Sequence, residues 1–225
     1  MSNSANPNWK PGIAIDSPVT EMITLSTDEM EVRDIYKLLI GSIVPRPIAF
    51  VSTISSKGIG NLAPFSFFNA VSSKPPTLMI SCGKKPDGTE KDTAKNIVET
   101  GEFVVNSASE WIIEPLVYCA GSFPEGVNEM KEVGLTALSS EIVKPARVKE
   151  SPIQLECTLI KSLDLEEDGV GSTTMFFGKV LKAHIYKEAY QDGRIDFKKI
   201  KSVGRLGGFQ YGLVSEIFEL KPPRI

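Results

Sequence analysis

Short runs of β-branched and aromatic residues, bounded by turn residues, recur along most of the chain. Such residues favour extended backbone because their side chains pack well on a pleated surface. The pattern predicts strands at residues 48–54, 77–82, 103–106, 153–160 and 173–186. Gly178, inside the last run, is expected to form a bulge. Residues 166–169 are expected to form a turn.

Helical spacing is confined to shorter stretches. Ser26 and Glu29 have the spacing of a capping box, and Gly41 is a natural C-terminal stop, so a helix is predicted over residues 28–40. Other helical stretches are predicted at residues 91–100, 111–120 and 128–133, the second of them broken or kinked at Pro115.

Three stretches lack a regular period. Residues 62–71 are apolar but interrupted by polar residues and a proline, so a regular strand through them is not expected. Residues 190–215 hold five glycines and are expected to form loops. Residues 1–25 are rich in Asn, Ser and Pro and are expected to form an N-terminal arm, which leaves residues 26–225 as one domain.

Strands outnumber helices and do not alternate regularly with them. This order argues against a doubly wound parallel sheet. It favours a mainly β fold, an antiparallel barrel with peripheral helices.

The scarcity of histidine and cysteine narrows the possible chemistry. The chain has one histidine, His184, and three cysteines, which lie too far apart in sequence to form a metal-binding pair. A serine or cysteine nucleophile would have to use His184 alone. We therefore expect no catalytic side chain and no metal site, and a cofactor that brings the redox or group-transfer chemistry. His184 itself is expected to be structural.

Charge and hydropathy argue against two further classes of protein, nucleic-acid-binding proteins and proteins with membrane-spanning helices. Lys and Arg total 25 against 28 Asp and Glu, and the net charge of -3 argues against nucleic-acid binding. No apolar run reaches the roughly 20 residues that a membrane helix needs. The first ten residues do not resemble a signal peptide, and an odd number of cysteines fits a reducing compartment, so we expect a cytoplasmic protein.

Three segments have the chemistry of a ligand site. Arg46 stands between two prolines, which stiffens its backbone and would suit recognition of a phosphate; the alternative is an ordinary surface arginine. Residues 61–69 interleave three phenylalanines with Ser and Asn, and would either meet a flat heteroaromatic ring or plug the core. Residues 91–93 (KDT) lie at a predicted helix start, where free N–H groups hold phosphate, or where Asp and Thr merely cap the helix.

Taken in order, these segments resemble the flavin reductase-like family, whose members bind FMN in a split β-barrel. The matching stretches are RPIAFVST (46–53), NLAPFSFFN (61–69), KDTAKNI (91–97), EFVVN (102–106), SPIQLEC (151–157) and RLGGFQY (205–211). Each is weak alone, but their order and spacing are specific. The similarity is to the branch that includes flavoredoxins and the reductase components of two-component monooxygenases.

The resemblance implies a set of cofactor-binding residues. Asn61, Ala63, Ser66, Phe67, Phe68 and Asn69 would lie along the isoalloxazine ring. The ribityl-phosphate end would be held by Arg46, Thr53, Ser81, Cys82, Lys91, Asp92 and Thr93. Arg205 and Tyr211 would belong to a substrate-side loop that reaches the site across a dimer interface.

The resemblance also implies a function. The hydride would come from NADH or NADPH, and the electrons would leave as reduced flavin for a monooxygenase. The alternatives are an electron-transfer flavoprotein of flavoredoxin type, which keeps its FMN and serves an acceptor protein, and a flavin-storage module without turnover. A homodimer is expected.

Overall fold

The protein is described by a computed structural model of residues 6, 8–124, 126–165, 169 and 171–222. Seven strands form one sheet in the order β2-β1-β5-β8-β9-β4-β3, and every neighbouring pair is antiparallel. These strands are β1 (Ala49–Ile54), β2 (Gly60–Phe65), β3 (Phe68–Ser73), β4 (Pro76–Gly83), β5 (Glu102–Ser107), β8 (Ile153–Asp164) and β9 (Thr173–Ile185). All five predicted strands are therefore confirmed.

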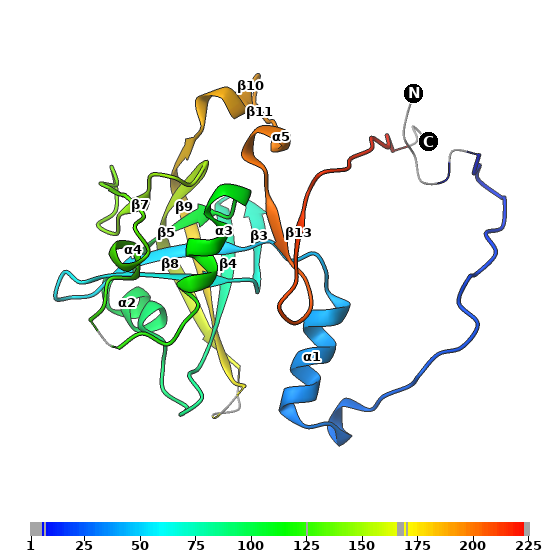
Figure 1. The fold of residues 1–225 in the computed structure, drawn as a ribbon, viewed down its shortest axis with the longest axis horizontal. Coiled ribbons are helices and arrows are strands. Elements are labelled where there is room, and N and C mark those ends of the chain that lie inside the picture. The colour runs from blue at the N-terminus through cyan, green and yellow to red at the C-terminus, as the bar shows by residue number, and fades with distance from the viewer. Residues whose placement is uncertain (1–5, 7, 125, 166–168, 170, 223–225) are drawn as a thin grey trace.

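Helices and short hairpins surround the sheet (Figure 1). The helices are α1 (Val32–Ser42), α2 (Asp92–Thr100), α3 (Ile113–Tyr118), α4 (Glu129–Glu132) and α5 (Phe197–Ile200), with 3-10 turns η1 (Thr27–Glu29), η2 (Glu110–Ile112) and η3 (Lys187–Ala189). The short strands are β6 (Ala137–Leu138), β7 (Arg147–Val148), β10 (Tyr190–Gln191), β11 (Arg194–Ile195), β12 (Val203–Arg205) and β13 (Tyr211–Leu213). No helix in the described part of the chain is long and apolar enough to cross a membrane.

The sheet curls on itself around a hydrophobic core. Although β2 and β4 lie near opposite ends of the strand order, they contact one another. Phe103 and Phe176 lie inside the curl, and Ile97 of α2 packs into the same cluster. Phe50 points to the other face of β1, where Leu116 of α3 covers it. Both faces of β1 are thus buried, which explains why its sequence is an almost continuous apolar run.

The first helix differs from its prediction at both ends. Ser26 makes no capping hydrogen bond, residues 27–29 form only a 3-10 turn, and the backbone of Glu31 is still extended. Helix α1 therefore begins at Val32, and it continues through Gly41 to Ser42. In the second predicted helix, α2, Gly101 has a φ of 70° and ends the helix as expected.

Residues 62–71 are more regular than predicted, since they form most of β2 and β3. Pro64 is tolerated in β2 because β2 is an edge strand, where a missing N–H costs no ladder hydrogen bond. Only Ser66 and Phe67 leave the strand geometry. The end of β2 and the first residue of this break, Pro64 to Ser66, border the candidate site.

Three other predictions were also wrong in detail. Pro115 does not kink a helix; it is the third residue of α3, where a backbone N–H has no partner within the helix. The ladder irregularities of β8 and β9 fall at Ile160 and Leu181, and Gly178 is instead required because a Cβ there would overlap the Phe103 ring. Residues 190–215 form two small hairpins and α5. The turn expected at residues 166–169 lies largely outside the described residues.

The two ends of the described chain contribute little to the core. No described residue before α1 is buried, and several apolar side chains there are exposed, among them Met22 and Ile23. The segment before α1 and the segment after β13 both run away from the sheet (Figure 1).

Candidate functional site

A groove of about 480 Å³ lies between α1, the end of β2, α3 and the β12–β13 hairpin. Its size is within the range of small-molecule sites. The groove brings the predicted site residue Ser66 together with Arg205 and Tyr211, two predicted site residues that are far from it in sequence. The Arg205 guanidinium lies 4.4 Å from the centroid of the Tyr211 ring. Phe209, at the tip of the hairpin, is 97% exposed and so leaves an aromatic ring at the rim with nothing covering it.

Arg46 holds the walls of this groove in place. Its guanidinium donates hydrogen bonds to the carbonyl oxygens of Ile43 (2.9 Å) and Ile40 at the end of α1. It also donates to the carbonyl of Leu206 (3.0 Å) and to Ser66 Oγ (3.4 Å). The residue is 5% exposed, so the surface-arginine interpretation is wrong.

The backbone of Arg46 also binds the β12–β13 hairpin. Its N–H donates to the Arg205 carbonyl (2.9 Å), and the Arg205 N–H donates back to the Arg46 carbonyl (2.8 Å). Four of the five guanidinium N–H groups of Arg46 are already used inside the protein. Arg46 is therefore positioned to shape the groove, and the structure does not support the expected contact with a phosphate.

The start of α2 adjoins the groove through Phe65. This ring borders the groove, and the ammonium of Lys91 lies 5.6 Å from its centroid. Lys91 is the N-cap of α2, is exposed, and makes no capping hydrogen bond with its side chain. Asp92 pairs with Lys85 (3.3 Å) and Lys95 (3.9 Å). The first turn of a helix offers N–H groups without intrahelical partners, and together with the Lys91 ammonium it favours an anion.

Beneath the start of α2 lies a buried polar cluster that joins α2 to β1 and β2. Asn61 Nδ2 donates to Thr93 Oγ1 (2.9 Å) and to Thr53 Oγ1 (3.1 Å). Asn96 Nδ2 donates to the same Thr53 oxygen (3.0 Å). Sequence reasoning missed Asn96, although it lies three residues after Thr93 and hence on the same face of the helix.

This cluster corrects the expected roles of Thr53, Asn61 and Thr93. All three are buried, and the side chain of Thr93 faces the cluster with 1% of the residue exposed. A hydroxyl in that position does not reach a phosphate outside the helix. These residues hold α2 against the sheet and so set where its N-terminus points.

Comparison with known proteins identifies this architecture. A model of the flavin reductase like domain matches residues 40–199. The chain belongs to the flavin reductase-like family. An uncharacterized protein of Halalkalibacterium halodurans is 40% identical over 202 residues, which cover 89% of this chain and 97% of that protein.

Solved structures agree with this family. Nitrilotriacetate monooxygenase component B from Bacillus cereus has a TM-score of 0.86 and 35% identity, covering 90% of this chain and 100% of its own. A flavin reductase with a split barrel domain from Shewanella frigidimarina has a TM-score of 0.76 at 21% identity, covering 87% of this chain and 96% of its own. The fold of this flavin reductase-like chain is thus a split β-barrel with peripheral helices, as the motifs indicated.

Other predicted cofactor residues of this flavin reductase-like chain lie away from the groove. Cys82 is buried in the core against α2, and burial raises the pKa of its thiol to about 12, so it stays a neutral core side chain. Ser81 Oγ is 2.7 Å from Thr173 Oγ1, on the next strand. Neither residue lines the groove.

The aromatic segment divides its side chains between the core and the surface. Phe65 and Phe68 pack against the core inside the sheet, and so does Ala63. Phe67 is 38% exposed, and Asn69 is exposed with its Oδ1 accepting from the Ala70 N–H. The core-plug interpretation therefore holds for Phe65 and Phe68, and Phe65 also borders the groove.

The lone histidine does not line the groove. His184 Nε2 lies 2.7 Å from Oε1 of Glu156, which is fully buried. Burial raises the pKa of Glu156, but hydrogen bonds from the Glu141 N–H, from His184 and from two further N–H groups outweigh it and lower the pKa to about 2. Among the described residues no group of three His, Cys, Asp or Glu side chains could hold a metal ion.

Proposed function

We propose that this chain is an FMN-dependent oxidoreductase that takes a hydride from NADH or NADPH and passes the electrons on as reduced flavin. The observation that carries this proposal is the position of Phe65. Phe65 lines the groove, and the Lys91 ammonium lies 5.6 Å from the centroid of its ring. A planar ring system in the groove and a phosphate at the start of α2 would thus be neighbours, as FMN requires.

The residues present fit such a cofactor. The groove is walled by Pro64 and Phe65, and by aromatic side chains of the β12–β13 hairpin. The strand geometry breaks at Ser66 and Phe67. The Phe67 carbonyl already accepts from the Ser81 N–H (2.9 Å), so the other backbone groups of this break would meet the polar edge of a flavin. Bound FMN would supply the hydride chemistry for which the side chains have no acid or base. The protein's part is to orient the flavin, exclude water from its ring and neutralise its phosphate.

We expect Lys91→Ala to weaken FMN binding about tenfold and riboflavin binding less than twofold. The lysine would contribute a charge-assisted contact of about 1.5 kcal/mol to the phosphate, which riboflavin lacks. Fluorescence titration of both flavins measures the two affinities. Lys74→Ala, an exposed lysine in the β3–β4 turn, is the control and should change neither. Equal loss for FMN and riboflavin would contradict a phosphate site at Lys91.

The catalytic proposal predicts repeated turnover. Anaerobic mixing of the purified protein with excess FMN and either NADH or NADPH should reduce many flavins per protein. The loss of flavin absorbance measures this reduction. If only one flavin per protein is reduced and it stays bound, the proposal would be replaced by an electron-transfer flavoprotein that serves an acceptor protein. Flavin binding without any reduction would leave a storage module, and no flavin binding would overturn the proposal.

The similarity to a monooxygenase component supports a partner that consumes reduced flavin.

We also propose a homodimer, since the exposed apolar side chains before α1 and after β13 are not covered by other described residues of the same copy. Sedimentation equilibrium tests this, and a monomeric mass would contradict it. A cytoplasmic location is supported by three free, buried cysteines.

A further inference from the structure

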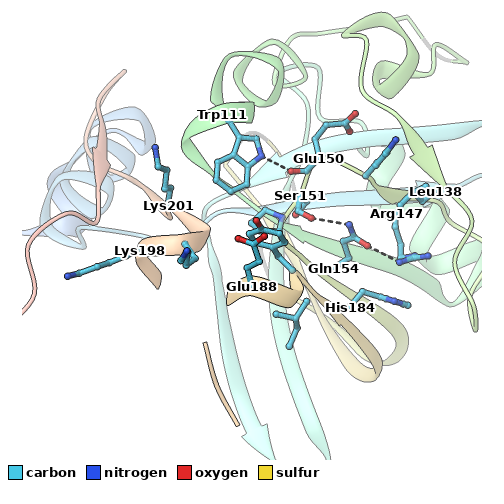
Figure 2. Close-up of a pocket in the computed structure, with 15 residues that line it drawn as sticks. Trp111, Leu138, Arg147, Glu150, Ser151, Gln154, His184, Glu188, Lys198 and Lys201 are labelled. Atoms are coloured by element: carbon cyan, nitrogen blue, oxygen red, sulfur yellow. Dashed lines mark hydrogen bonds between the residues drawn. The ribbon is translucent and has the colours of Figure 1, made fainter. Parts of the chain in front are cut away.

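A second cavity, of about 620 Å³, shares no lining residue with the flavin groove. It lies between the α5 segment, η2 and the ends of β8 and β9. Figure 2 shows Lys198 and Lys201 on one side, Arg147 and His184 on the other, and Trp111 at the upper edge. We call this cavity the Trp111 cleft.

Positive charge is concentrated in the Trp111 cleft, in a chain that is negative overall. Its cationic lining residues are Arg147, Lys149, Lys198, Lys199 and Lys201. Its carboxylates are Glu150 and Glu188. Cations therefore outnumber carboxylates by five to two.

Two of these cations are already committed. Arg147 donates to the Ser139 carbonyl (2.8 and 3.2 Å) and to Gln154 Oε1 (3.0 Å). Lys201 pairs with Glu110 at 2.9 Å. The ammonium groups of the other three, Lys149, Lys198 and Lys199, have no ion pair or hydrogen bond within the described residues.

Within the described residues, neither carboxylate of the cleft forms an ion pair with these three lysines. Both oxygens of Glu150 accept from the Thr136 N–H, at 3.2 and 3.1 Å. Interaction with the Glu188 carboxylate raises the pKa of Tyr186. The three ammonium groups are therefore available to an anion that enters the cleft.

Trp111 gives the cleft a fixed aromatic surface. Its Nε1 donates to the Glu150 carbonyl at 2.7 Å, so the indole is held by its edge, while 46% of the residue is exposed (Figure 2). A held indole beside cations provides a stacking surface for a heteroaromatic base. The cavity is concave and within the size range of nucleotide sites, which favours a small molecule over an acidic protein surface.

We propose that the Trp111 cleft binds the adenosine diphosphate moiety of a nucleotide. The purine stacks on Trp111, and the diphosphate is held by Lys198, Lys199 and Lys149. Lysine suits this role because its ammonium is a mobile point charge that can follow phosphate oxygens.

The position of the cleft relates it to the flavin groove. Lys201 lines the cleft and Arg205 lines the groove; they are four positions apart, so the chain between them spans at most about 14 Å. The adenosine diphosphate moiety can therefore belong to a dinucleotide whose other end reaches the groove, or to a free nucleotide. The dinucleotide source rests on the proposed function, whereas binding of ADP does not.

The test is a titration with ADP in a Trp9→Phe background, which leaves Trp111 as the single tryptophan. We expect saturable quenching of its fluorescence by ADP and at least tenfold weaker binding of adenosine. The double variant K198A/K199A should raise the Kd for ADP at least tenfold. The control K74A/K179A removes the same charge from exposed positions of β3–β4 and β9 and should stay within twofold. No saturable response to ADP, or equal loss in both double variants, would overturn the proposal.

Steady-state reduction of FMN then separates the two sources. A raised KM for NADH or NADPH in K198A/K199A, at unchanged kcat, would assign the cleft to the dinucleotide. Loss of ADP binding at unchanged KM would assign it to a free nucleotide. If the wild-type protein reduces no flavin, the proposed function fails while the flavin-free ADP titration still decides on the cleft.

Discussion

Replacing Arg46 with lysine is expected to lower the free energy of unfolding by about 2–4 kcal/mol, because a buried acceptor that loses its partner costs about 1–3 kcal/mol. The guanidinium joins the end of α1 to the β12–β13 hairpin, through Ile40 and Ile43 on one side and Leu206 on the other. A lysine ammonium is a single point and cannot span these acceptors. Urea unfolding of the two proteins, followed by circular dichroism, measures the difference.

The same substitution is expected to weaken FMN and riboflavin about equally, by at least tenfold. Arg46 acts on the groove walls, through Ser66 and the hairpin, and not on the phosphate. This distinguishes R46K from Lys91→Ala, which should affect FMN alone. Arg33→Lys, an exposed change on α1, is the control and should alter stability by less than about 0.5 kcal/mol. Wild-type stability and flavin affinity in R46K would contradict the positioning role.

Glu156→Gln is expected to destabilise the protein by about 3 kcal/mol at pH 7. The pKa of Glu156 falls from its ordinary value of 4.5 to about 2 in the folded protein, and each unit corresponds to about 1.4 kcal/mol. The carboxylate accepts the N–H groups of Ile142 and Val143 as well as the contact with His184. Glutamine keeps the shape and one acceptor oxygen but loses the charge.

The sign of the pH dependence follows from the lowered pKa. Because folding favours the ionised carboxylate, its stabilisation is complete above about pH 4.5 and declines as the pH falls toward 2. Denaturant unfolding at pH 7, 4 and 3 should therefore show the difference between wild type and E156Q shrinking with acid. Glu216→Gln, an exposed residue after β13, should give no such change. A difference that stays constant between pH 7 and 3 would contradict this account.

The strands and the second helix were predictable because their signals are local. The run at residues 48–54 became β1, and Gly101 ended α2 with a positive φ. The family could be recognised from the order of its motifs, each of which is read without knowing its neighbours in space. Gly41 shows the limit of such signals, since α1 continues through it to Ser42.

The site was less predictable, because a polar side chain takes its partners from segments distant in sequence. Arg46, Thr53 and Thr93 have residue types that suit a phosphate, and the motifs placed all three near one. In the folded chain Arg46 binds carbonyls on either side of the groove, and both threonines accept from Asn61.

Residue type and spacing were thus enough for the fold class, the main strands, the helix start at Lys91 and the scarcity of acid-base groups. The curling of the sheet and the docking of α1, α2 and the β12–β13 hairpin decided which side chains border the groove. The same contacts decided which side chains form internal hydrogen bonds instead. Those contacts are long-range, and burial forces each enclosed donor to pair with whatever acceptor the packing brings beside it.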